Sequence, residues 1–394
     1  MWLMGCGSAD SGSLIESSRP SGPASLGPNA APAGEDTGLV ADEPLVGGAC
    51  AGAVAESTFA SALCSCEDTN VAGYLRTRSH REDDAAGDLL ANVGVNRDYL
   101  TTGYANVGGS FTVAGPRDVL FGGLLSAGQD LLLQPGADVA GVVDVGRDAW
   151  LGDDVRAFGR VAIERDLYAD GGSGFRGIAL VDVGGERHTQ DVAIAPPCAC
   201  GSGEIIDVAA LVDEAREQND NAAIGLDADE LNVIVGIGTA LTLPGGRYYL
   251  NQIGGIGGIN LKVTGKTALF IGDDLLATGA FRVELAPDAE LDIFVRDNLA
   301  ITGAALFGDR ERPAATRVYV GGTGDVTVAG YAAFVGNLYA PTANILVGGF
   351  GQIYGSLFGK NINAAGFLSV GYDASIQTTG TECPPAAADV PRIR

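Results

Sequence analysis

The chain has 394 residues, and its 49 Asp and Glu against 24 Lys and Arg give a formal net charge of −25. Binding to a phosphate backbone requires clustered Lys and Arg, and the sequence contains no such run. Its net negative charge would also repel phosphates, so we expect no nucleic-acid partner. Hydrophobic residues make up 46% and aromatic residues 7%, which predicts a large, mainly aliphatic core. Gly, Asp or Pro interrupts every apolar run before it reaches the roughly 18–20 residues of a membrane-spanning helix.

The chain begins MWLMGC. The last four of these residues, ending at Cys6, resemble the lipobox of bacterial lipoproteins, whose cysteine is lipidated after the signal peptide is removed. Because five residues are too few for a signal peptide, we expect the true start codon to lie upstream. The resemblance implies lipidation at Cys6, with Gly7 typical of sorting to the outer membrane or cell surface. The alternative is an ordinary N-terminus with a free or buried Cys6.

The segment after Cys6 lacks the composition of a folded domain. In residues 7–49, 27 of 43 positions are Gly, Ser, Ala or Pro, and none is aromatic. Such a segment cannot bury enough apolar surface to fold. We therefore predict a disordered tether over residues 1–49, including the lipobox-like start.

The remaining cysteines form an even set. They are Cys50, Cys64, Cys66, Cys198, Cys200 and Cys383. Six cysteines suit three disulfides in an oxidising compartment, with fifteen pairings open. Zinc is the weaker alternative, because the spacing is C-x-C and the chain has only two histidines. We expect no metal site.

Short apolar runs separated by Gly, Asp, Asn or Pro fill the chain from residue 110 onward. Residues 270–280 align with residues 294–304 at an offset of 24, and a looser copy begins at residue 319. Repeats of 20–25 residues built from strand-length runs indicate stacked coils. The predicted fold is all-β, a right-handed parallel β-helix, or β-solenoid, in two halves. An antiparallel sandwich or barrel is the alternative.

One segment breaks this pattern. In residues 205–219, Asp207 can cap a helix whose apolar side chains recur at helical spacing. These are Val208, Leu211, Val212 and Ala215. We expect an N-terminal half over residues 50–197, a Cys-flanked helical connector over 198–226, a C-terminal half over 227–378 and a tail over 379–394. The helix is expected to pack over an open coil end or a seam.

The C-terminal half carries sequence motifs of its own. Residues 336–343 read GNLYAPTA, residues 351–360 read GQIYGSLFGK and residues 371–373 read GYD. They resemble a C-terminal β-helical domain of unknown function in exported bacterial surface and pilus-associated proteins, including lipoproteins. The coils are also distantly similar to bactofilins, the polymer-forming cytoskeletal solenoids. The resemblance implies a fold and an exported location, with no catalytic residues to transfer.

A search for chemistry yields weak candidates. His80 and His188 lie in polar stretches, so we expect solvated loop residues and no histidine base. Asp273, Asp274 and Asp297 occupy equivalent corners of the 24-residue repeat and could share a cation or act as paired carboxylates. Their suitability for tight turns is the favoured interpretation. No nucleotide-binding motif occurs, and we expect no cofactor.

Six tyrosines could form a glycan-stacking strip if they face outward, although half-buried wall positions are the favoured interpretation. They are Tyr248, Tyr249, Tyr319, Tyr331, Tyr339 and Tyr354.

The leading hypothesis is a non-enzymatic exported lipoprotein that acts as a structural or adhesive element at the cell surface. Its expected partners are the membrane, through Cys6, and a surface polysaccharide or further copies of itself. The alternatives are a polysaccharide-acting β-helix enzyme that uses carboxylates and a self-assembling, bactofilin-like scaffold.

Overall fold

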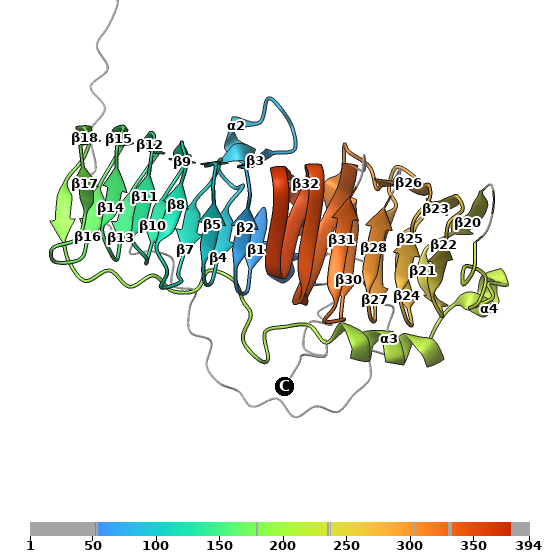
Figure 1. Ribbon diagram of the computed structural model, residues 1–394. Coiled ribbons are helices and arrows are strands. Elements are labelled where there is room, and N and C mark those ends of the chain that lie inside the picture. The colour runs from blue at the N-terminus through green and yellow to red at the C-terminus, as the bar shows by residue number, and fades with distance from the viewer. Residues whose placement is uncertain are drawn as a thin grey trace, which may run out of the picture. The chain divides into compact units, whose positions relative to one another are not determined.

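The described part of the chain is an all-β parallel solenoid, which confirms the predicted fold class (Figure 1). A computed structural model describes residues 52, 54–178, 180–234, 236, 238–302, 305–329 and 333–379. These residues belong to one compact unit, Glu43–Arg394. The predicted lipobox and tether, and with them Cys6, Cys50 and Cys383, lie outside the described residues.

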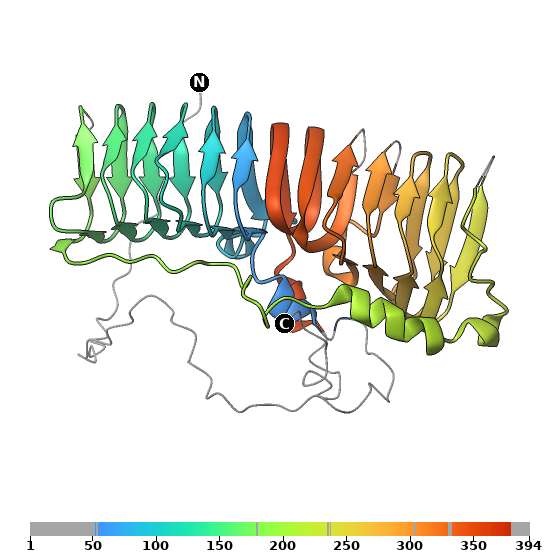
Figure 2. The ribbon, with the colours of Figure 1, turned by 60° about the horizontal axis from the view of Figure 1, so that its bottom comes forward.

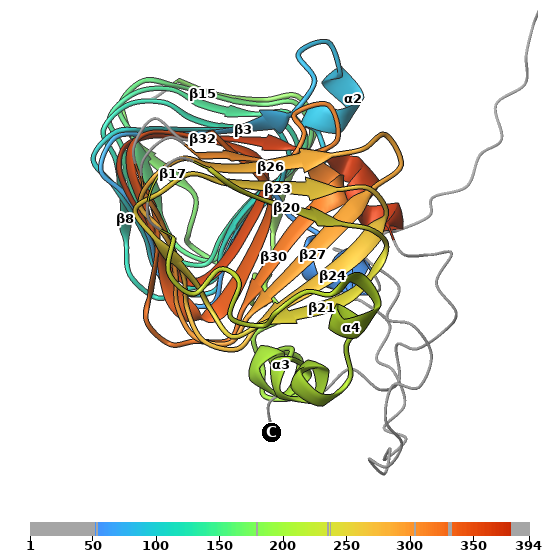
Figure 3. The same cartoon turned by 90° about the vertical axis from the view of Figure 1, so that its right-hand side faces the viewer.

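Each coil contributes one strand to each of three walls, because a strand generally pairs in parallel with the strand three places further along the chain. The cross-section is triangular (Figure 3). Wall I consists of β1 (Leu63–Ser65), β4 (Val93–Val95), β7 (Phe111–Val113), β10 (Leu131–Leu133), β13 (Ala149–Leu151), β16 (Leu167–Ala169), β19 (Arg187–Thr189), β21 (Gly246–Leu250), β24 (Lys266–Ile271), β27 (Glu290–Val295) and β30 (Thr316–Val320).

The other two walls follow the same rule. Wall II consists of β2 (Thr69–Val71), β5 (Tyr99–Thr101), β8 (Val119–Phe121), β11 (Ala137–Val139), β14 (Val155–Ala157), β17 (Phe175–Gly177), β22 (Ile253–Gly255), β25 (Leu275–Ala277), β28 (Leu299–Thr302) and β31 (Asp325–Ala329). Wall III consists of β3 (Tyr74–Ser79), β6 (Tyr104–Val107), β9 (Leu125–Ala127), β12 (Val143–Val145), β15 (Arg160–Ile163), β18 (Leu180–Val183), β20 (Thr239–Leu243), β23 (Ile259–Val263), β26 (Phe281–Leu285) and β29 (Ala305–Phe307).

The core follows from strict alternation in very short strands. In β10, Leu131 and Leu133 point inward and are fully buried, whereas the central Leu132 points outward and is half-buried. Stacked coils bury the inward aliphatic side chains against one another, which no single coil could do. The predicted offset of 24 residues is confirmed by the register, in which Phe270 lies beside Phe294.

The two halves are joined in an order that differs from the order along the chain. β32 (Ala333–Tyr372) winds through two coils, and its second coil pairs with β1, β2 and β3. The N-terminal half therefore winds outward from the middle of the solenoid to β19. A crossover over residues 190–207 returns past the middle, and the C-terminal half winds from the far end back to β32 (Figures 1 and 2). The halves are coaxial.

Helix α3 (Val208–Glu217) begins at the predicted cap, where the Asp207 carboxylate accepts a hydrogen bond from the Ala210 backbone N–H at 3.0 Å. Its predicted apolar face is buried. The expectation that it covers a coil end or seam is wrong, because α3 lies along wall I against β21, β24 and β27 (Figure 2). A row of aromatic side chains on that wall supplies the apolar surface that an amphipathic helix needs.

The remaining helices are single turns: α1 (Ala55–Thr58), α2 (Ala85–Asp88), α4 (Asn221–Ile224), η1 (Pro313–Ala315) and η2 (Ala374–Thr378). Among the described residues, no helix is both long enough and apolar enough to cross a bilayer.

Two disulfides fasten the crossover to the first coil of the N-terminal half. They join Cys64 to Cys198 and Cys66 to Cys200. Pairing of these four cysteines confirms the prediction that they form disulfides. The two C-x-C segments run side by side, so the bridges hold the crossover where the two halves meet.

Candidate binding face

Wall I is covered along the C-terminal half. Its outward row is aromatic, and its rings stack at about one coil spacing: 4.8 Å between the centroids of Phe270 and Phe294 and 4.7 Å between those of Phe294 and Tyr319. Tyr249, Tyr319 and Tyr339 belong to this row, yet each is at most 5% exposed. They lie beneath α3, the crossover and α1, so these three are wall residues, as the favoured interpretation had it, but are fully covered, and the alternative of an exposed tyrosine strip is wrong for them.

Of the other tyrosines in that set, Tyr248 points into the core, and Tyr354 is half-buried under the guanidinium of Arg310, as the favoured interpretation expects. Tyr331 lies outside the described residues.

The start and end of the described chain meet on the covered side of the solenoid. The Gly52 backbone N–H donates to the Asp292 carboxylate of β27 at 2.6 Å, and any side chain at Gly52 would touch Thr379. α1 contacts η2, which follows the last strand. Both chain ends therefore lie where walls III and I meet, near the middle of the solenoid. In a triangular section this corner faces wall II.

Wall II has none of the described helices against it (Figure 3). Its central outward row crosses both halves in register. From one end to the middle of the N-terminal half, this row is uncharged. Its members are Gly254, Leu276, Ala300, Thr327, Leu346, Asn363, Asn70, Leu100 and Leu120. Charges begin only further along, at Asp138, Arg156 and Arg176.

A second uncharged row lies beside the first, at the border with wall III. It consists of Thr278, Thr302, Ala329, Gly348, Ala365, Ala72, Thr102, Gly122, Ala140, Phe158 and Ile178, all at least partly exposed. Wall III differs, because its outward positions include Arg76, Lys262, Arg282, Asp144 and Arg160. On a chain with a net charge of −25, wall II is thus a broad face with two adjacent uncharged rows.

Near the junction of the halves, aromatic rings at the start of the wall III strands border this face, and a pair of asparagines lies on it. Tyr74 stacks on Phe367 at 4.9 Å and meets Tyr104 edge-on at 4.4 Å, and Tyr104 is 45% exposed. Nearby, Asn70 donates to Asn363 through its side-chain amide at 2.9 Å. The pair still has an unused donor and acceptor capacity. Exposed rings beside neutral amides are the groups that pack on and hydrogen-bond uncharged sugars.

The other border of wall II is a ladder of Asp and Asn side chains. Asn344 donates to Asp325 at 2.9 Å, Asn361 donates to Asn344 at 2.8 Å, and Asn361 accepts from the Asp68 backbone N–H at 2.9 Å. Each side chain joins one coil to the next, and the ladder passes from the C-terminal to the N-terminal half without a break. These polar groups are used in holding the coils together.

The predicted carboxylate cluster lies at the same border, between wall I and wall II. The Asp274 carboxylate accepts hydrogen bonds from the Asn298 backbone N–H and side-chain amide at 2.9 and 2.8 Å. Desolvation, and then the carboxylates of Asp274 and Asp297, raise the pKa of Asp273. The described residues contain no group of three or more His, Cys, Asp or Glu side chains placed to hold a metal ion. The structure accounts for Asp274 as a turn residue and brings Asp273 and Asp297 together as mutually repelling acids.

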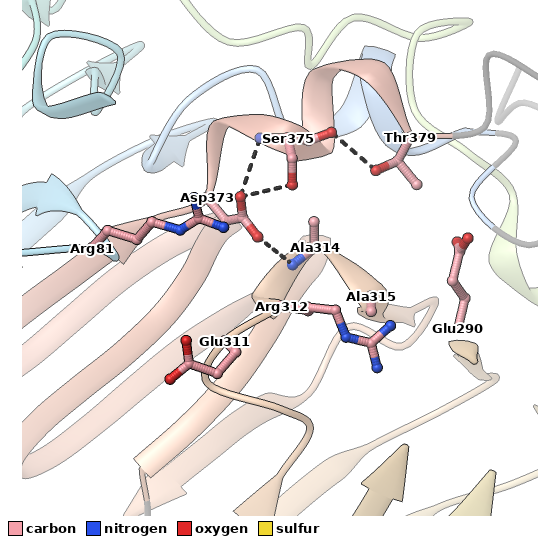
Figure 4. A pocket seen from close by; sticks show the side chains of 9 residues that line it. All are labelled: Arg81, Glu290, Glu311, Arg312, Ala314, Ala315, Asp373, Ser375 and Thr379. Carbon is pink, nitrogen blue, oxygen red and sulfur yellow. Dashed lines mark hydrogen bonds between the residues drawn. The ribbon is translucent and has the colours of Figure 1, made fainter. Parts of the chain in front are cut away.

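A pocket of about 200 Å³ lies at the corner where the chain ends meet (Figure 4). The Asp373 carboxylate accepts hydrogen bonds from the Ala314 backbone N–H at 3.0 Å and the Ser375 hydroxyl at 2.7 Å, which ties η1 to η2. His80 Nδ1 lies 3.8 Å from the same carboxylate. Because Asp373 stands between Ser375 and His80, this trio lacks the Ser–His hydrogen bond of a nucleophilic triad.

The prediction that His80 is a solvated loop residue is wrong. Its side chain is only 6% exposed, because the loop before α2 folds against the end of β32. His188 is 35% exposed and stacks on Tyr168 at 4.7 Å.

Sequence reasoning missed wall II. Its members are separated by up to 293 residues, as between Asn70 and Asn363. The local signal that could have identified them is the uncharged residue at the centre of each short run, but the register across the two halves was required to align them.

Comparison with known proteins adds little beyond the fold. The model of a family described as Domain of unknown function (DUF7305) matches residues 193–379, which hold part of the crossover, α3, α4 and the C-terminal half. This agrees with the uncharacterised domain expected there. No curated protein matches the chain.

Among solved structures, the chain is similar to an ice binding protein from an Antarctic bacterium, Flavobacteriaceae. The two are 14% identical, the match covers 80% of this chain and 97% of that chain, and the TM-score is 0.20. A likeness at that score supports no conclusion about ligand or activity. The lipoprotein and bactofilin resemblances stay predictions.

Proposed function

We propose that this protein is a non-enzymatic, exported surface element whose solenoid holds wall II against an extended, uncharged polymer, with a neutral polysaccharide as the expected partner. The observation that carries the proposal is the position of wall II. It is uncovered by the described helices, has two adjacent uncharged outward rows, and lies opposite the corner where the described part of the chain begins and ends.

Charge supports a neutral partner. An anionic polymer would be repelled by a chain of net charge −25 and by the carboxylates that border wall II. A strongly cationic partner would be drawn to the acidic borders rather than to the uncharged rows. An uncharged polymer avoids both effects, and a long rigid face offers it many weak contacts in regular succession.

The location is proposed on separate grounds. Disulfides persist in oxidising compartments, and two are present here. A lipid on Cys6 would attach the chain from the side of the solenoid on which Gly52 lies, which is opposite wall II. Replacing Cys6 with Ser should abolish incorporation of radiolabelled palmitate in cells expressing the full-length gene. Unchanged incorporation would contradict lipidation at this residue.

Binding is tested by co-sedimentation with insoluble neutral polysaccharides, cellulose and chitin, alongside an acidic one, pectate. We expect retention on at least one neutral polymer and none on pectate. Ala300→Lys together with Leu120→Lys places two charges on wall II and should reduce retention about tenfold or more. The matched control, Ser126→Lys with Ala162→Lys, places two charges on the outward row of wall III and should leave retention unchanged.

Failure of all neutral polymers to retain the protein, or equal loss in the control, would contradict the proposed role of wall II. Depolymerisation of any of these polymers that disappears in Asp273→Ala or Asp297→Ala would instead favour the enzymatic alternative.

A further inference from the structure

The strand edges are largely capped at one end of the solenoid and unpaired at the other. At the β20–β22 end, the Asn221 side chain of α4 accepts from the Tyr249 backbone N–H at 2.9 Å and donates to the Tyr249 carbonyl at 2.7 Å. It thereby occupies the hydrogen-bonding groups of edge strand β21. On wall II, Ile234 forms a β-bridge with Gly255 of β22. Two of the three edges at this end are therefore capped.

The opposite end has no comparable cap within the described residues. β17, β18 and β19 pair on one side only, with β14, β15 and β16. The last coil also carries the two most exposed large apolar side chains of the described chain, Ile178 at 81% and Leu180 at 80%. Unpaired strand edges together with exposed apolar side chains form a surface that readily pairs with another sheet edge.

The molecule itself contains such a contact. At its middle, the last coil of β32 stacks on β1, β2 and β3, although these segments are separated by nearly 300 residues. Coil ends of this chain therefore pair edge to edge without a direct chain connection between them.

We propose that the β17–β19 end is a dimerisation surface for a second copy of this chain. Because two of the three edges at the β20–β22 end are capped, that end is a poor acceptor for the open end of another molecule, and head-to-tail growth is disfavoured. Two open ends can still meet about a two-fold axis, which closes the assembly at two copies.

The charge of the terminal coil suits this contact. Residues 170–189 contain three acids, Asp170, Asp182 and Glu186, against Arg176 and Arg187, so the coil has a net charge of −1 within a chain of −25. Repulsion between copies across this end is therefore small for so acidic a chain. The product is a rod of twice the length, with Ile178 and Leu180 of each copy buried in the contact.

Light scattering coupled to size-exclusion chromatography tests the proposal on the oxidised full chain over a concentration series. We expect a monomer–dimer equilibrium with no larger species, and small-angle scattering should show that the dimer is about twice as long as the monomer. Ile178→Asp with Leu180→Asp should weaken the dimer about tenfold or more, because it places charges in an apolar contact. Circular dichroism verifies that this variant is folded.

The matched control is Val233→Asp with Ile256→Asp, two side chains that are each 76% exposed near the capped end. This variant should dimerise like the parent chain. A wild-type chain that is monomeric throughout, filaments, a side-by-side dimer in the scattering curve, or disruption by the control variant would each overturn the proposal.

Discussion

Asp and Asn residues at the corners act as connectors between coils. Asp130 accepts from the Asp148 backbone N–H at 3.2 Å, and Asp148 accepts from that of Asp166 at 3.0 Å. Each carboxylate satisfies a donor that the turn would otherwise leave unpaired. The large excess of acidic residues in this chain is thus partly a requirement of its corners.

At one corner, the carboxylates of Asp273 and Asp297 lie close together, and their mutual repulsion can be measured. Since the pKa of Asp273 is raised in the folded state, ionising it disfavours folding, and this cost appears as the pH rises above the ordinary Asp range. We expect Asp273→Asn to raise the free energy of unfolding at pH 7 slightly, by less than about 0.5 kcal/mol for so exposed a group. The difference should vanish below about pH 3.5.

Urea unfolding at several pH values, with and without millimolar calcium, measures this effect. The same denaturation series for Asp288→Asn, at an exposed acidic residue away from this cluster, serves as the control. Calcium that stabilises the wild type but not Asp273→Asn would instead show a cation site at this corner.

At the scale of elements, the crossover is held by two neighbouring disulfides and by α3. Each bridge spans 134 residues of chain. Because they join nearly the same two points, the second bridge closes almost no additional loop once the first has formed.

This arrangement predicts a strongly non-additive response. Replacing Cys64 and Cys198 with Ser should lower the free energy of unfolding by no more than about 1 kcal/mol, since the other bridge still closes the large loop. Replacing all four cysteines should lower it by about 2–5 kcal/mol. Denaturant titrations of the Cys64/Cys198, Cys66/Cys200 and fourfold variants measure the three values. Two additive losses of equal size would contradict shared loop closure.

At the scale of the whole molecule, the order of coils in space is a permutation of their order in sequence. Two half-solenoids wind in the same direction, and the one encoded second in the chain comes first along the axis. The crossover connects the two halves but contributes no strand to any wall, and its residues 201–204 are exposed.

A circular permutant should therefore fold. We expect a chain opened between Ser202 and Gly203, with Thr379 joined to Gly52 by a short Gly/Ser linker, to give the same circular dichroism spectrum and a Tm within a few degrees of the parent. A permutant opened inside β13, between Ala149 and Trp150, is the control and should be clearly less stable. An unfolded Ser202 permutant would show that the crossover is needed to guide folding.

Because the two ends of the described chain lie side by side, we can predict how two further cysteines pair. Gly52 lies against Thr379, and two and four residues separate these positions from Cys50 and Cys383, a distance that extended chain spans easily. We expect a Cys50–Cys383 disulfide and an unpaired Cys6. Mass spectrometry of a non-reduced digest should detect this linked peptide beside the Cys64–Cys198 and Cys66–Cys200 peptides, which serve as internal controls. A peptide linking Cys6 to Cys50 would contradict it.

The sequence alone determined the local features of this protein. Short strands with small corner residues indicated a solenoid, the repeat at residues 270 and 294 set the register of two coils, and Asp207 with its apolar stripe located α3. These signals extend over one coil or one helix and depend on side-chain alternation and backbone geometry, which neighbouring residues determine.

Only the tertiary structure decided which coils adjoin. One coil edge presents much the same backbone groups as another, so nothing local specifies that β32 stacks on β1 or that the aromatic row of wall I lies beneath α3. The burial of His80 and the continuity of the uncharged rows of wall II follow from that stacking, because both depend on residues of the two halves that meet only when the halves join.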